Sequence, residues 1–154
     1  MKRSHQFFIR NLCTALGIPM MLMSMSLFSG SATAQSVTVQ FLKGRSGKPT
    51  RKGERVSVYF ITENHRRFLD LRTDKQGTVQ FDADGAETFE VTAVGYIACG
   101  EQPIGAPAHK YPVSEILKNG LLTQNNCGHL NSEPIRGRLL YFVRPATWWE
   151  LFKN

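Results

Sequence analysis

Residues 71–96, LRTDKQGTVQFDADGAETFEVTAVGY, decide the fold of this chain. In 77–81 and 88–94, apolar side chains alternate with polar ones, which is the period of a β-strand with one buried face. The segment 73–77 precedes the first of these runs, and the segment 82–85 separates the first run from the second. Both contain aspartate, which can hydrogen-bond the local backbone, and glycine, which can adopt a positive φ. The stretch therefore predicts strands joined by tight turns.

Further strands are predicted on both sides of this stretch. Apolar residues at alternate positions predict strands at 37–41 and 56–60, and 68–72 begins a third. The run 138–144 is apolar on both faces, and this pattern predicts a central strand.

One short helix is predicted between the last two strands. Residues 112–120 carry Ser114 as a candidate N-cap and Gly120 as a candidate C-cap. The flanking segments 101–112 and 121–132 are polar and contain prolines or glycines, so they are predicted loops. The whole pattern predicts a mainly β protein, an antiparallel sandwich of six to seven strands with one short helix.

The first 34 residues have the composition of a secretory signal. A basic start precedes the apolar run 12–28, and Ala32 and Ala34 supply the small residues of a cleavage site. An uncleaved membrane anchor is the alternative, because the apolar run approaches spanning length. We expect cleavage near Ala34, no stable membrane insertion afterwards, and a secreted or periplasmic location.

Residues 35–154 then form a single domain. The chain has 19 lysines and arginines against 12 acidic residues, and three of the basic residues lie in the signal. The remaining 16 basic residues against 12 acidic ones give a net charge of +4. This excess is mild, and export argues against nucleic acid as a partner.

Two cysteines follow the signal, Cys99 and Cys127. In an oxidising compartment an even pair usually forms a disulfide. A bridge that closes a loop of about 29 residues should stabilise the fold by about 3.5 kcal/mol on the chain-entropy model. A redox pair is the alternative, but such pairs usually have the close C-x-x-C spacing.

Five short motifs follow one another in the first half of the mature chain. They are Gly47-Lys48-Pro49, Val56-Ser57-Val58, Thr73-Asp74 with Gly77, Val79 with Phe81, and Val91-Thr92-Ala93-Val94-Gly95-Tyr96. Their order resembles the bacterial carboxypeptidase regulatory-like domains, members of the transthyretin-like and Cna-B-like β-sandwiches. The resemblance implies an immunoglobulin-like or transthyretin-like sandwich with a family core at 37–96. A helix-containing excursion at 97–137 and a last strand with an aromatic tail at 138–154 would follow. It also implies an accessory module for binding or folding.

Two groups of residues are candidates for binding. The loop 43–55 carries six basic residues against one glutamate, so an anionic surface such as an acidic glycan would attract it. The aromatic tail carries two adjacent tryptophans, which would face opposite sides of a strand and leave one ring exposed for a sugar or a protein. The structural alternative for the loop is that it is simply solvated. The structural alternative for the tryptophans is that both pack over the end of the sandwich and close it. The predicted contact residues are Arg51, Lys52, Arg55, Trp148 and Trp149.

No catalytic or metal-binding motif occurs in the sequence. His65, His109 and His129 lack the H-x-x-x-H and H-E-x-x-H spacings of metal sites. The Tyr-Arg-Gly-Ser type tail of the transthyretin-like hydrolase of the urate pathway is absent. Four aspartates lie near predicted turns: Asp70, Asp74, Asp82 and Asp84. They could bind Ca²⁺, but turn formation is the simpler explanation of their positions.

We therefore expect an exported, non-enzymatic module without a cofactor, which binds an envelope protein or an anionic glycan. A small hydrolase or metal-dependent enzyme built on the three histidines is one alternative. A purely structural envelope protein is another.

Overall fold

Nine strands and two short helices make up the described part of the chain. The computed structural model describes residues 35–62, 66–100 and 108–151. The strands are β1 (Ser36–Lys43), β2 (Arg55–Ile61), β3 (Arg66–Arg72), β4 (Thr78–Asp82), β5 (Thr88–Ala93), β6 (Tyr96–Ala98), β7 (Tyr111–Pro112), β8 (Leu121–Leu122) and β9 (Arg138–Pro145). The helices are α1 (Val113–Asn119) and α2 (Trp148–Leu151).

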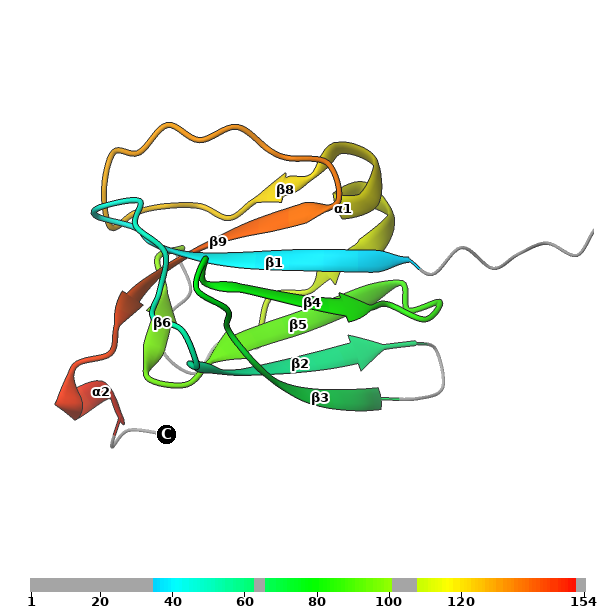
Figure 1. The fold of residues 1–154 in the computed structure, drawn as a ribbon, viewed down its shortest axis with the longest axis horizontal. Helices are drawn as coiled ribbons and strands as arrows, with labels where there is room; N and C mark the ends of the chain where they lie inside the picture. The colour runs from blue at the N-terminus through cyan, green and yellow to red at the C-terminus, as the bar shows by residue number, and fades with distance from the viewer. Residues whose placement is uncertain (1–34, 63–65, 101–107, 152–154) are drawn as a thin grey trace, which may run out of the picture. The chain divides into compact units, whose positions relative to one another are not determined.

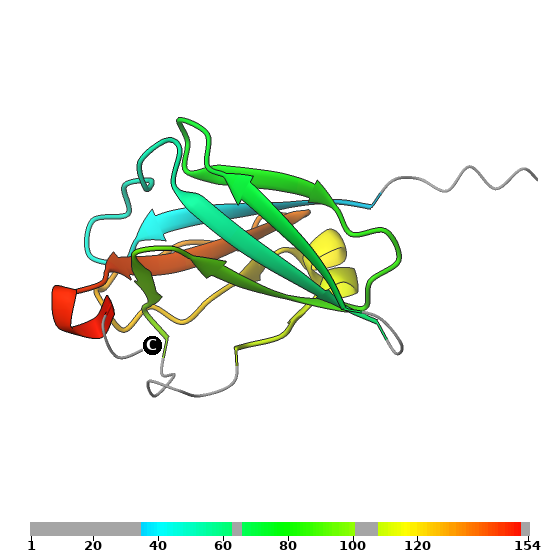
Figure 2. The ribbon, with the colours of Figure 1, turned by 90° about the horizontal axis from the view of Figure 1, so that it is seen from below.

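These strands form two sheets with one core between them (Figure 1). One sheet has the order β4-β1-β9-β6, with β8 also paired to β9, and the other has the order β3-β2-β5-β7. Figure 2 shows the strands of the second sheet running across those of the first at an angle. The predicted mainly β sandwich is confirmed.

The alternating apolar faces form the core, as predicted. Val37 and Val39 of β1 and Val56 and Val58 of β2 have no exposed surface. The two sheets also meet through aromatic rings, because Phe81 of β4 packs edge to face against rings of the opposite sheet. Its ring centroid lies 5.3 Å from that of Phe60 and 5.2 Å from that of Phe89.

Strand β9 is central, as its apolar sequence predicted. It lies between β1 on one side and β6 with β8 on the other, and its residues 139–143 are buried. The sandwich is not purely antiparallel, because β9 runs parallel to both β1 and β8. A parallel neighbour needs a long connection, and the excursion at 97–137 allows the chain to enter β9 in this direction.

The strand count exceeds the predicted six to seven because three strands are very short. β6 has three residues, and β7 and β8 have two each. β7 and β8 occupy ends of segments that the sequence predicted as loops. Two or three residues show no alternation, so these strands are defined by their pairing with β5 and β9 rather than by a sequence pattern.

Helix α1 forms where the sequence predicted it, but its start differs. Pro112 is the N-cap and no side chain caps the helix, so Ser114 is not the N-cap and instead lies inside the first turn. Gly120 ends the helix with φ 76°, as expected of glycine at that position. Ile116 is fully buried, and the half-buried Leu117 packs against the core.

The predicted disulfide between Cys99 and Cys127 is present, with the two Cα atoms 5.3 Å apart. The Cys99 amide donates to the carbonyl of Phe142 in β9, at 2.9 Å. The Asn126 amide in turn donates to the Cys99 carbonyl, at 2.8 Å. The bridge therefore attaches the segment after β8 to the chain that leaves β6.

Candidate binding site

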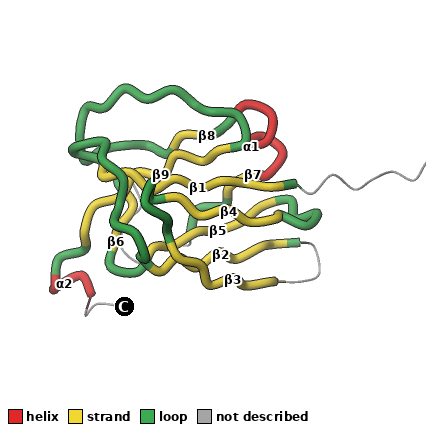
Figure 3. Tube along the Cα trace, in the orientation of Figure 1, coloured by secondary structure: helices red, strands yellow, loops and turns green. Residues whose placement is uncertain are grey.

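Both predicted groups of contact residues lie at one end of the sandwich. The β1–β2 loop and α2 occupy the same end in two perpendicular views (Figures 1 and 2), and Figure 3 shows the loop in green and α2 in red. The β5–β6 turn connects them, because Val94 donates its amide to Arg55 and Gly95 accepts the amide of Ala146. We call this surface, formed by residues 43–55 and 144–151, the basic end.

The three predicted basic contact residues differ in their surroundings. Arg55 forms an ion pair with Asp70 at 2.7 Å, so its charge is partly balanced. The hydrogen bond from Arg55 lowers the pKa of Asp70, and the same bond raises the pKa of Arg55. Arg51 and Lys52 are exposed and form no ion pair with a described carboxylate. They are therefore better placed than Arg55 to meet an anionic partner.

A cavity of ≈ 530 Å³ opens beside the start of this loop. Lys43 and Arg45 line it on the loop side, and Arg144 lines it on the β9 side. None of the described residues that line the cavity carries a carboxylate. The sequence placed both loop cations in a basic segment, but it gave no sign that a cavity would form beside them.

The cavity exists because the segment 125–128 returns to the end of β1. Asn125 donates its side-chain amide to the Gly44 carbonyl at 2.9 Å and accepts the Cys127 amide at 3.2 Å. Gly44 lies so close to the disulfide that a Cβ atom built on it would lie 2.5 Å from the Cys99 sulfur. The glycine and the bridge together fix this wall.

The tryptophans do not lie on a strand, so the expectation of opposite faces was wrong. Trp148 and Trp149 begin α2, and their rings stack on each other with centroids 3.7 Å apart. They are 57% and 65% exposed, so neither closes the end of the sandwich. Leu151 is also 54% exposed, and α2 thus presents an apolar surface at the same end as the loop cations.

A local signal explains why a helix forms here. Thr147 donates both its amide and its hydroxyl to the Glu150 carboxylate, each at 2.8 Å. This T-x-x-E spacing is a capping pattern, which starts a helix at the residue after the threonine. The spacing is present in the sequence, and it is the signal that would have predicted a helix at this position.

An ion pair holds α2 against β9. Arg144 donates to both carboxylate oxygens of Glu150, at 2.8 and 2.5 Å, and the Glu150 side chain is only 17% exposed. The bonds from Arg144, followed by those from Thr147, hold the pKa of Glu150 far below its ordinary value. The charged form of this carboxylate is therefore the form that fixes α2 and its two tryptophans.

This ion pair predicts a change in the tryptophans at acid pH. Because the pKa of Glu150 is lower in the folded protein than in the unfolded chain, its contribution is complete above the ordinary value of about 4.3 and is lost as pH falls below it. We expect tryptophan fluorescence to change over this acid range while the β-sheet signal in circular dichroism persists.

The variant Glu150→Gln should show the acid fluorescence at neutral pH and little further change on acidification. Glu115→Gln, on the exposed face of α1, is the matched control and should follow the unmodified protein. Identical pH profiles for Glu150→Gln and the unmodified protein would show that the ion pair does not hold α2.

The aspartates considered as Ca²⁺ ligands form hydrogen bonds and ion pairs within the protein. Asp74 accepts the Thr78 hydroxyl at 2.6 Å and the amides of Thr78 and Gln76, both at 2.8 Å. These bonds, that from the Thr78 hydroxyl above all, lower the pKa of Asp74 and form the β3–β4 turn. Asp84 pairs with Arg67 at 2.7 Å, and Asp82 accepts the Asp84 amide. Asp74 and Asp82 thus accept backbone amides within turns, whereas the carboxylates of Asp70 and Asp84 form ion pairs.

The histidines are not gathered into a metal site in the described part of the chain. His65 lies outside the described residues. His109 and His129 are both exposed, and the His109 ring packs beside Tyr111 with centroids 4.8 Å apart. No group of three or more His, Cys, Asp or Glu side chains that could hold a metal ion occurs within 35–62, 66–100 and 108–151.

The fold and this site define a β-sandwich with a basic, aromatic surface at one end. Comparisons with protein-family models, with curated proteins and with solved structures found no match. The carboxypeptidase regulatory-like resemblance therefore stays a prediction. Within the described residues, no helix has both the length and the apolar character that crossing a membrane requires.

Proposed function

We propose that this chain is an exported, non-enzymatic β-sandwich module that binds an anionic envelope glycan through the basic end. The observation that carries the proposal is the combination of cations without described carboxylate partners and two exposed tryptophans at one end. Five loop cations meet this description: Lys43, Arg45, Lys48, Arg51 and Lys52. Removal of residues 1–34 and delivery to the periplasm or the medium are part of the proposal.

The chemistry of an acidic polysaccharide fits both features of this surface. Its repeated carboxylates or sulfates would meet several cations along the loop, each contact being weak because it is exposed and screened by salt. The sugar rings would pack on the tryptophan faces, which offer a large contact area at small entropic cost. Neither feature needs a cofactor or a catalytic group.

We expect the protein to bind a polyuronate, such as alginate, and not neutral dextran. Binding should weaken as salt rises, because exposed charge pairs are screened. The variant Lys43→Gln/Arg45→Gln should bind polyuronate about tenfold more weakly, since two charge contacts at the surface contribute about 1.4 kcal/mol together. The measurement is isothermal titration calorimetry at low ionic strength.

A charge-matched control separates a site from a general effect of net charge. Lys110→Gln/Lys118→Gln removes the same charge from exposed positions outside the basic end, and it should leave the affinity unchanged. Equal losses in the two double variants would contradict the proposal. Capture of an envelope protein, with no binding to polyuronate, would move the partner from a glycan to a protein.

A further inference from the structure

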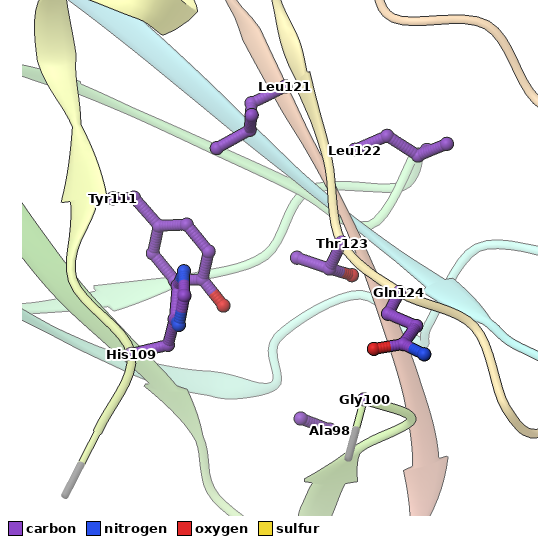
Figure 4. Close-up of a pocket in the computed structure, with 8 residues that line it drawn as sticks. All are labelled: Ala98, Gly100, His109, Tyr111, Leu121, Leu122, Thr123 and Gln124. Atoms are coloured by element: carbon purple, nitrogen blue, oxygen red, sulfur yellow. The ribbon is translucent and has the colours of Figure 1, made fainter. Parts of the chain in front are cut away.

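A second cavity, of ≈ 390 Å³, lies where β6 and β8 separate along β9 (Figure 4). β8 pairs with the first half of β9 and β6 with the second half, and both strands leave β9 near Phe142. The cavity lies where β6 and β8 diverge. Ala98 of β6, Tyr111 of β7 and Thr123, which follows β8, line it. Its size falls in the roughly 300–1,000 Å³ range of small-molecule sites.

Polar side chains surround this hollow. Figure 4 shows His109 and Tyr111 on one side, with Thr123 and Gln124 on the other. The Leu121 side chain points toward Tyr111, and it adds an apolar patch to the wall. Imidazole, hydroxyl and amide groups together offer both donors and acceptors of hydrogen bonds.

Two of these residues are held in place by the fold. The Thr123 hydroxyl oxygen accepts the Phe142 amide at 2.9 Å, and this leaves its own O–H able to donate. Tyr111 is buried at 5% exposure and packs edge to face against Tyr141, with centroids 5.8 Å apart. Burial raises the pKa of Tyr111, so its phenol stays neutral at physiological pH. A ligand would thus meet a largely preformed surface.

The groups of the described lining point to a class of ligand. The eight described residues that line the cavity offer imidazole, hydroxyl and amide groups beside aliphatic and aromatic surface. A purely apolar ligand would leave the surrounding imidazole, hydroxyl and amide groups without partners. Sugar hydroxyls both donate and accept, and the C–H faces of a sugar ring pack against aromatic and aliphatic side chains.

We propose that this cavity binds a single uncharged sugar residue, with His109 and Gln124 as its hydrogen-bonding partners. The site is separate from the cavity at the basic end, because the two cavities share no described lining residue. The proposal rests on different residues from the glycan-binding proposal, so each can fail while the other stands.

The test is a nuclear magnetic resonance titration of the mature protein with neutral methyl glycosides of glucose, galactose, mannose and N-acetylglucosamine. At least one of them should shift the amide signals of Ala98, Gly100, Thr123 and Gln124. His109→Ala and Gln124→Ala should each weaken that binding by about fivefold, as expected for one lost hydrogen bond. Both side chains are exposed, so neither variant should unfold the protein.

Matched controls are available elsewhere on the surface. His129→Ala and Gln76→Ala remove the same side-chain types from exposed positions outside the cavity, and they should leave the affinity unchanged. No shift with any glycoside at millimolar concentrations would overturn the proposal, as would shifts that persist in both cavity variants. Inorganic phosphate is the anionic probe, and shifts at this cavity with phosphate but not with a sugar would also overturn it.

Discussion

Replacing Cys99 and Cys127 together by serine is expected to lower the free energy of unfolding by about 3.5 kcal/mol. The two residues are 28 positions apart, so loss of the bridge releases a long loop in the unfolded chain. The bridge also positions the segment 125–128 against Gly44, and this contact forms one wall of the basic cavity. We therefore expect the variant to lose stability and to bind polyuronate more weakly.

Urea denaturation followed by circular dichroism measures this effect. Reduction of the unmodified protein with dithiothreitol should lower its stability by a similar amount, and the serine variant should not respond to the reductant. A loss below about 1 kcal/mol would contradict the prediction, since removal of a native bridge from a small exported domain typically costs 2–5 kcal/mol. Two free thiols in the purified, unreduced protein would contradict the bridge itself.

Replacing Gly120 by alanine is expected to cost about 3 kcal/mol or more. Gly120 has φ 76° and ψ 163°, a combination that is essentially confined to glycine. A Cβ atom there would also overlap the backbone of Ile135. That backbone has little room to move, because Gly137 donates to the Ile116 carbonyl at 2.8 Å just before β9 begins. The strand and the helix would have to separate.

Gly137→Ala is the matched control for this variant. Gly137 has nearly the same φ, 75°, but a Cβ atom there would meet nothing within 4 Å. It should therefore cost only the strain of a positive φ, about 1–2 kcal/mol. Thermal and urea denaturation of the two variants would show the difference, and equal losses would contradict the role given to Ile135.

The sandwich could be predicted because the alternation of apolar and polar residues in its longer strands matches the alternation of buried and exposed side chains. In β1 and β2 every second residue is apolar, and these are the residues that the structure buries. The long apolar run of β9 likewise predicted its central place. The direction of β9 could not be predicted, because it depends on how the preceding excursion returns to the sheet.

The candidate site was predicted only in part, for similar physical reasons. The number of basic residues in the sequence predicted the basic loop. Whether the charge of a given arginine is paired depends on a carboxylate from another strand, as for Arg55 and Asp70. The cavity beside Lys43 depends on a segment that is distant in sequence and is held there by the disulfide. The tryptophans were recognised as unusual, but their exposure follows from the capping bonds of Thr147 and Glu150.

The most direct test of the account is to locate polyuronate on the protein by nuclear magnetic resonance. A short polyuronate oligosaccharide is added to isotope-labelled protein comprising residues 35–154, at low ionic strength. If the basic end is the binding surface, the indole N–H signals of Trp148 and Trp149 shift together with the amides of residues 43–52, and added salt reverses both changes. Shifts confined to β3 or α1, or no shift at all, would contradict the claim that the basic end is the binding surface.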